Sequence, residues 1–136
     1  MKLLRVGQKG NEKPAAIDKD GKIRDISSHV ADLNPDNVNF ETISKLESIN
    51  LSSLTELSSR ERIGSCITKP GKFVAIGLNY SDHAAETGAE VPSEPIMFMK
   101  ATSCIVGPND DVEIVSGSKK LDWEVELGII IGKETK

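Results

Sequence analysis

Three carboxylates alternate with apolar residues near the end of this 136-residue sequence, at Asp122, Glu124 and Glu126. Successive side chains of a β-strand point to opposite faces, so a strand here would place all three acids on one face. Buried like charges need a compensating cation. Oxygen ligands without a nearby Cys or His favour Mg²⁺, with Mn²⁺ or Ca²⁺ as the other candidates. The alternative is a solvent-facing strand whose acids pair with lysines such as Lys119 and Lys120.

A second candidate for chemistry is His83, followed three residues later by Glu86. One helical turn would put both side chains on the same face, where a carboxylate makes an imidazole a better base and fixes its tautomer. Such a pair can activate water near neutral pH. The alternative is an ordinary ion pair on a helix surface. Tyr80 follows a predicted strand, where polar groups often carry function, and the alternative is that it only forms part of a turn. Lys100 could either orient an anionic substrate or only cap a strand.

The elements that precede these residues have the pattern of a small β unit followed by helices. Short strands are expected at residues 3–6, 15–17 and 22–26. Asp20 and Gly21 favour a tight hairpin turn before the third strand. Between residues 27 and 62, apolar residues recur at helical separations and predict two short amphipathic helices. We expect this N-terminal domain to comprise residues 1–69.

Pro70 and Gly71 interrupt the pattern and mark the predicted start of a second domain, residues 70–136. Its strands are expected at 73–78, 96–99, 111–115 and 122–132, and its turns at 107–111 and 116–120. A helix is expected at 81–87, capped by Ser81 and ended by Gly88. Three consecutive isoleucines at 129–131 indicate that the last strand runs into a buried core.

Composition excludes several classes of protein. Hydrophobic residues make up 38% and charged residues 28% of the chain, the balance of a soluble globular protein. The 17 basic residues form no stripe, and with 21 acidic residues they argue against nucleic acid as a partner. No apolar run approaches the roughly 20 residues of a membrane span, and we expect no membrane partner and no signal peptide. Cys66 and Cys104 lie too far apart for a CxxC motif, which fits a reducing cytoplasm.

Four pieces, in this order, resemble the fumarylacetoacetate hydrolase family: residues 77–86, 95–100, 107–108 and 122–132. The resemblance implies an α+β fold that is mostly β. A small N-terminal α/β domain would be followed by the first part of a rolled, mixed β-sheet barrel, truncated at its C-terminal end. Members of the family commonly dimerise, so the resemblance also implies a homodimer for the complete protein.

The same resemblance assigns roles to individual residues. Glu124 and Glu126 match the metal ligands of the family, with a third carboxylate expected beyond Lys136, and Asp122 is not made a ligand. His83 and Glu86 match the pair that activates water. The substrate would be a small 2-oxo acid held by Mg²⁺, with Tyr80 and Lys100 as substrate contacts.

Met1–Gly7, a turn at Glu12–Pro14 and Ile23–Ile26 resemble more closely the bacterial members known as ureidoglycolate lyase or 2,4-diketo-3-deoxy-L-fuconate hydrolase. The expected reaction is therefore either hydrolysis of the diketo sugar acid or cleavage of ureidoglycolate to glyoxylate and urea. Because the chain covers only the first half of the family's pattern, the alternative is a truncated, non-catalytic fragment or binding module of the same fold.

Overall fold

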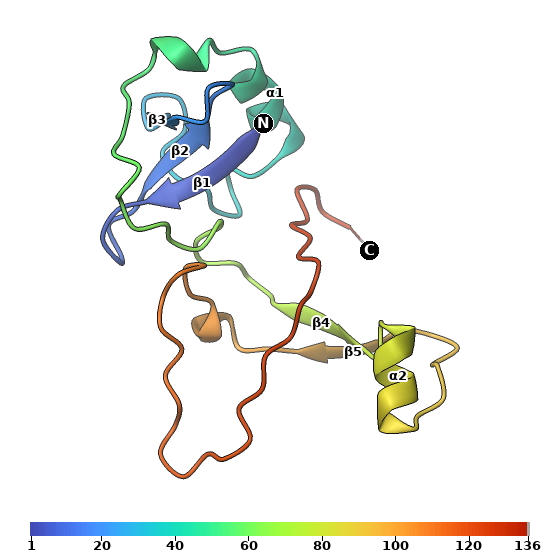
Figure 1. Ribbon diagram of the computed structural model, residues 1–136. Coiled ribbons are helices and arrows are strands. Elements are labelled where there is room, and N and C mark those ends of the chain that lie inside the picture. Colours follow the sequence, from blue (N-terminus) through green and yellow to red (C-terminus); the bar gives the residue numbers. More distant parts are fainter. Residues whose placement is uncertain (136) are drawn as a thin grey trace. The chain divides into compact units, whose positions relative to one another are not determined.

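The computed structural model describes residues 1–135, which form two compact units: Met1–Thr68 together with the chain from Val106, and Lys69–Ile105. The first unit contains an antiparallel sheet of β1 (Lys2–Val6), β2 (Lys13–Ile17) and β3 (Ile23–Asp25) in the order β1-β2-β3 (Figure 1). The predicted strands at 3–6, 15–17 and 22–26 are confirmed. The predicted domains 1–69 and 70–136 stay predictions.

The β2–β3 hairpin turns where the sequence predicts it. Gly21 has a positive φ of 78°, and the Asp18 carboxylate accepts hydrogen bonds from the backbone N–H groups of Asp20 and Lys22, both at 2.9 Å. The turn predicted at residues 12–14 is wrong, because Pro14 pairs with Arg5 inside the sheet and its carbonyl accepts the N–H of Ile26 at 3.2 Å. The chain reverses instead at residues 7–11.

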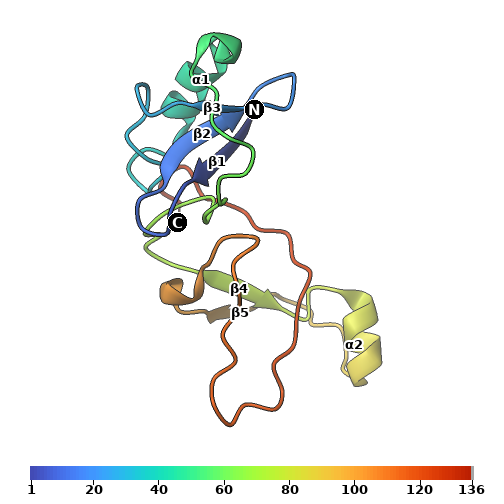
Figure 2. The ribbon, with the colours of Figure 1, turned by 60° about the vertical axis from the view of Figure 1, so that its left-hand side comes forward.

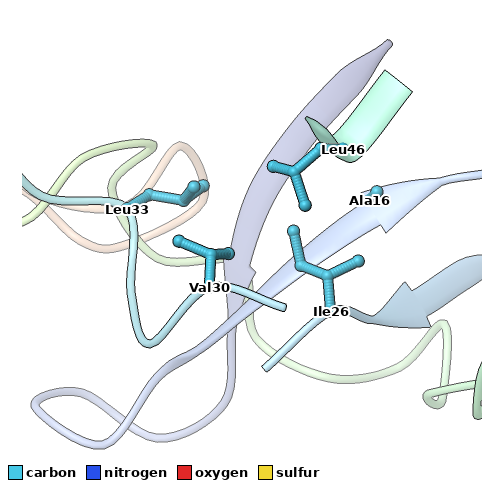
Figure 3. Packing of buried hydrophobic residues seen from close by; sticks show 5 residues of the cluster. All are labelled: Ala16, Ile26, Val30, Leu33 and Leu46. Carbon is cyan, nitrogen blue, oxygen red and sulfur yellow. The ribbon is translucent and has the colours of Figure 1, made fainter. Parts of the chain in front are cut away.

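Helix α1 (Phe40–Glu47) packs against one face of this sheet. Its N-terminus is capped by the Asn39 side chain, which accepts the N–H of Thr42 at 2.9 Å. Leu46 of the helix meets Ala16 of β2 in the core (Figure 3). The buried residues of this core are Ala16, Ile26, Val30, Leu33 and Leu46. The neighbouring residue Ala15 points to the opposite face and packs in a second cluster, with Leu4, Val6 and Ile23.

Only one of the two α-helices predicted between residues 27 and 62 forms. The second apolar stretch begins with a 3-10 turn at Leu51–Ser53 and then becomes extended. The reason lies in the neighbouring strand: the N–H of Asp25 donates to the carbonyl of Thr55 at 2.9 Å, and the N–H of Leu57 donates to Ile23 at 2.8 Å. These hydrogen bonds to β3 take the place of those that an α-helix would make.

The second unit is an antiparallel hairpin of β4 (Val74–Gly77) and β5 (Ile96–Met99), with helix α2 (Ser81–Thr87) in the connection between them (Figure 2). A 3-10 turn follows at Thr102–Cys104. The predicted strands, the helix and its end at Gly88, with φ 67°, are confirmed. The predicted Ser81 cap is wrong, because Tyr80 occupies the N-cap position and makes no side-chain capping bond.

The strands predicted at 111–115 and 122–132 do not form. From Val106 to the last described residue the chain has turns but no helix or strand, and Trp123 is 81% exposed. The predicted burial of residues 129–131 is also wrong, since all three isoleucines are exposed. A strand requires a partner to complete its hydrogen-bond ladder, and among the described residues no strand pairs with these segments.

The turns predicted in this region are confirmed. The N–H of Asp110 donates to the carbonyl of Gly107 at 3.1 Å, and that of Ser118 donates to Val115 at 2.9 Å, next to Gly117 with φ 85°. The described chain is thus a mixed α/β structure with few helices and two small antiparallel sheets. None of the helices within residues 1–135 is both long and apolar enough to cross a lipid bilayer.

Candidate functional site

Helix α2 presents His83 and Glu86 on one face. Nδ1 of His83 lies 3.7 Å from Oε2 of Glu86, as expected for residues three positions apart. Both side chains are exposed, the imidazole at 57% and the carboxylate at 82%. The shared face is confirmed, and the catalytic role of the pair stays a prediction.

The chemistry open to this pair follows from its distance and exposure. The 3.7 Å between Nδ1 of His83 and Oε2 of Glu86 is longer than a charge-assisted hydrogen bond. Such a bond has a donor–acceptor distance of about 2.7–2.9 Å. A small rotation of the Glu86 side chain would make that bond, because neither group is packed in place. With Nδ1 held by the carboxylate, Nε2 of His83 would be available to accept a proton from water.

Tyr80 and Lys100 lie at different ends of the β4–β5 hairpin. Tyr80 directly precedes α2, beyond the end of the hairpin where Gly77 pairs with Ile96. Lys100 follows β5 at the other end, where its backbone N–H donates to the carbonyl of Phe73 at 2.9 Å. Four residues of strand, roughly 13 Å, separate these two ends. The hairpin therefore places the backbone of Tyr80 near α2 and that of Lys100 far from it, and substrate binding by both stays a prediction.

Glu124 and Glu126 belong to the exposed, irregular segment of the first unit. Because this segment is not a strand, the alternation that would align them with Asp122 does not apply. Within residues 1–135 no group of three or more His, Cys, Asp or Glu side chains is arranged to hold a metal ion. Two carboxylates nevertheless suit Mg²⁺ in donor type, since that ion is often held by one or two carboxylates and keeps several waters. The pair remains a predicted part of a metal site.

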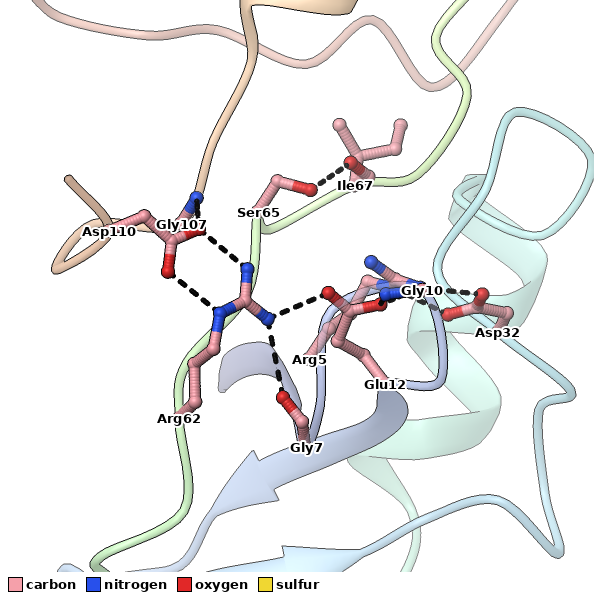
Figure 4. Close-up of polar contacts among 10 residues, drawn as sticks. All are labelled: Arg5, Gly7, Gly10, Glu12, Asp32, Arg62, Ser65, Ile67, Gly107 and Asp110. Carbon is pink, nitrogen blue, oxygen red and sulfur yellow. Dashed lines mark hydrogen bonds and ion pairs between the residues drawn. The ribbon is translucent and has the colours of Figure 1, made fainter. Parts of the chain in front are cut away.

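The sequence-based predictions missed a network of five charged residues in the first unit (Figure 4). Arg5, which is only 5% exposed, donates to both oxygens of Asp32 at 2.6 and 3.0 Å and approaches Glu12 at 3.5 Å. Arg62 donates to Glu12 at 2.8 Å and to both oxygens of Asp110 at 2.7 and 2.6 Å. The two arginines thus bridge three carboxylates from distant parts of the sequence.

These contacts shift the pKa values of three members of the network. Hydrogen bonds from Arg62, and then from the Gly107 N–H, lower the pKa of Asp110 to about 2. Burial acts to raise the pKa of Glu12, but hydrogen bonding to Arg62 and the charge of Arg5 bring it below its ordinary value. Hydrogen bonds to Asp110 and Glu12 raise the pKa of Arg62. Glu12, Arg62 and Asp110 therefore stay charged near neutral pH, so the network fits a structural clamp better than acid–base chemistry.

No local pattern in the sequence points to this network. Arg62 lies 50 residues from Glu12 and 48 from Asp110. The sequence predicts only a turn at residues 107–111, and that turn forms. The Asp110 side chain, which accepts the Gly107 N–H at 2.8 Å, also binds Arg62. Pairings over such separations depend on the tertiary fold.

A family model described as "Fumarylacetoacetate (FAA) hydrolase C-terminal" matches residues 72–136 of the chain. All six predicted site residues fall within this range: Tyr80, His83, Glu86, Lys100, Glu124 and Glu126.

Curated relatives match the whole chain. A protein of Burkholderia ambifaria and one of Burkholderia lata, both named "Putative hydrolase", are 52% identical to it over 136 residues. The match covers all of this chain and 48% of each relative. The chain therefore spans about half the length of the curated relatives that it matches.

The fold also has a solved counterpart. The "Crystal structure of a putative HpcE protein from Mycobacterium smegmatis" superposes with a TM-score of 0.62 and 25% sequence identity, covering 87% of this chain and 42% of that one. Residues 72–136 thus match the C-terminal family of fumarylacetoacetate hydrolases, and the fold is similar to that of the HpcE protein.

Proposed function

We propose that this chain forms part of an enzyme of the fumarylacetoacetate hydrolase family, a hydrolase or lyase that acts on a small 2-oxo acid or a related compound. The observation that carries the proposal is the family match over residues 72–136, which includes every predicted site residue. The shared helical face of His83 and Glu86 and the relatives named as hydrolases support it.

In this proposal, Glu124 and Glu126 hold the metal, Mg²⁺ in the first instance and Mn²⁺ or Ca²⁺ as alternatives. Bound there, the ion would supply positive charge that stabilises negative charge on substrate oxygens. His83 accepts a proton from the attacking water, and Glu86 orients its ring. Tyr80 and Lys100 are the proposed substrate contacts, Lys100 by its charge and Tyr80 by its hydroxyl.

The two specific reactions proposed are hydrolysis of 2,4-diketo-3-deoxy-L-fuconate and cleavage of ureidoglycolate. The same metal ligands and base can serve either reaction, so these residues do not choose between them. Product analysis does: with Mg²⁺ and both compounds offered in parallel to the gene product that contains this chain, pyruvate plus lactate identifies the first reaction. Glyoxylate plus urea identifies the second, and the absence of both sets of products rejects this finer assignment.

Metal dependence is tested separately by titrating Mg²⁺ into the protein and its Glu124→Gln variant. The proposal expects binding that weakens at least about tenfold in the variant, since one of two carboxylates is removed. Glu41→Gln is the matched control, because Glu41 is an exposed carboxylate that pairs with Lys45 on α1. An equal loss of affinity in both variants would rule out a specific role for Glu124.

A non-catalytic binding module of the same fold is the second candidate function. It is favoured by the finding that, within residues 1–135, no three potential ligands come together. This candidate predicts no Mg²⁺ binding and no turnover, with unchanged solution behaviour when Glu124 and Glu126 are replaced. The family resemblance further supports a homodimer, which sedimentation of the complete protein would test. The wide separation of Cys66 and Cys104 supports a cytoplasmic location.

A further inference from the structure

Leu78 has a left-handed backbone conformation, with φ 49°, between the end of β4 and the start of α2. Such a conformation is uncommon for residues other than glycine, and leucine lacks the polar side chain with which asparagine stabilises it. Strained residues of this kind persist where the surrounding structure fixes them, and they often occur at functional sites. The structure around Leu78 shows what fixes it.

The chain before Leu78 is held by the pairing of β4 with β5. Gly77 ends β4 in register with Ile96 of β5. A Cβ atom placed on Gly77 would lie 3.3 Å from Cε1 of Phe98 and 3.8 Å from Cβ of Ile96. A side chain at Gly77 would therefore crowd the Phe98 ring, and the pairing of Gly77 with Ile96 holds the strand end in place.

The chain after Leu78 is also held. Tyr80 has an extended conformation, and its carbonyl accepts the first helical hydrogen bond from the N–H of Ala84 at 3.2 Å. Ala84 is completely buried, which anchors the helix. Only Leu78 and Asn79 therefore connect a fixed strand end to a fixed helix start, and one left-handed residue makes the sharp change of direction.

We propose that Leu78 is a positioning residue: its left-handed backbone sets the direction of α2, and with it the placement of His83 and Glu86 relative to the β4–β5 hairpin. The catalytic consequence rests on the proposed function, whereas the geometric part does not. Helix α2 is about 10 Å long, so a modest change of direction at Leu78 would move the His83 ring by ångströms. A displacement of about 1 Å can slow a reaction by about 100-fold.

The alternative role for Leu78 is simple packing, since its side chain is half-buried. Two substitutions separate these roles because they have opposite effects. Leu78→Asn removes the apolar side chain but tolerates the left-handed conformation. Leu78→Val keeps an apolar side chain, but its branched Cβ makes the left-handed conformation unfavourable.

The test makes two kinds of measurement on the complete gene product. The first is amide hydrogen exchange of Ser81–Thr87, and the second is kcat and KM on the compound that the unmodified protein converts. We expect Leu78→Asn to keep kcat, and the protection of the α2 amides from hydrogen exchange, within about threefold of the values for the unmodified protein. We expect Leu78→Val to lose the protection and to lower kcat about 100-fold, with KM changed less than about threefold.

The reverse order, with Leu78→Val unaffected and Leu78→Asn impaired, would show packing and overturn the proposal. Equal behaviour of the two variants would overturn it as well. If the unmodified protein converts no 2-oxo acid or related compound, the proposed function fails, and hydrogen exchange in α2 still decides whether the left-handed backbone at Leu78 holds the helix in place.

Discussion

Arg62 and Asp110 form a two-pronged ion pair, with Nε to Oδ1 at 2.7 Å and Nη2 to Oδ2 at 2.6 Å. The arginine also donates to the Gly7 carbonyl at 3.2 Å, and its own carbonyl accepts the Gly7 N–H at 2.9 Å. The turn that begins at Gly107 is thereby tied to the residues that follow β1. This paired geometry is the arrangement that makes an arginine–carboxylate bond strong and directional.

Replacing Asp110 with asparagine should release this turn. The uncharged side chain cannot accept both hydrogen bonds from Arg62, which would be left partly unpaired beside Glu12. We expect the midpoint of thermal unfolding to fall on the order of 4 °C and limited proteolysis near residues 107–110 to become faster. Asp111→Asn, at the exposed neighbouring position, is the control, and an equal effect of both substitutions would refute the role of the ion pair.

Low pH should lower the stability of the folded protein by protonating the Asp110 carboxylate. The pKa of Asp110 is lowered to about 2 in the folded chain, from 3.8 in the absence of these contacts. A folded-state pKa below the unfolded value means that the stabilisation is complete above about pH 4 and is lost as the pH falls towards 2. Urea unfolding between pH 2 and 6 should show a steeper loss for the unmodified protein than for Asp110→Asn. Parallel curves for the two proteins would contradict this.

Local features of the fold could be predicted from the sequence. Asp20 with Gly21, and Gly88 after a helix-forming stretch, specify their turns through backbone preferences of a few neighbouring residues. The His83–Glu86 pair shares a face for the same reason, because helical spacing alone brings the two together.

Features that depend on distant residues could not be predicted. The alternation around Trp123 is typical of a strand, but a strand needs a partner, and within the described chain this segment has no strand beside it. Leu51 and Leu54 have helical spacing, yet the next residues hydrogen-bond to β3. The pairing of Arg62 with Asp110 likewise depends on the tertiary fold, since neither residue type nor spacing indicates it.

The contribution of α1 to stability should depend on one buried side chain. Leu46 is 1% exposed and fills the space between the helix and Ala16, so Leu46→Ala should leave a cavity and lower the free energy of unfolding by about 2–5 kcal/mol. Phe40, in the same helix but 73% exposed, is the control, and Phe40→Ala should change that free energy by less than about 0.5 kcal/mol. Urea denaturation measures the free energy of unfolding of both variants. A larger decrease for Phe40→Ala than for Leu46→Ala would show that Leu46 does not hold α1 to the core.

If the proposed function is right, His83 and Glu86 should act as one unit. His83→Ala removes the base and should lower kcat by about 100-fold to 10,000-fold on the substrate identified by product analysis. Glu86→Gln leaves the imidazole in place without its orienting carboxylate, so it should have a smaller effect.

The decisive measurement on this pair is the double variant. Because Glu86 would act only through the imidazole, adding Glu86→Gln to His83→Ala should lower kcat no further. Glu90→Gln, an exposed carboxylate after α2, is the control and should leave kcat unchanged in either background. Additive losses would mean that the two residues contribute independently, and that the 3.7 Å contact between them is an ordinary ion pair on the helix surface.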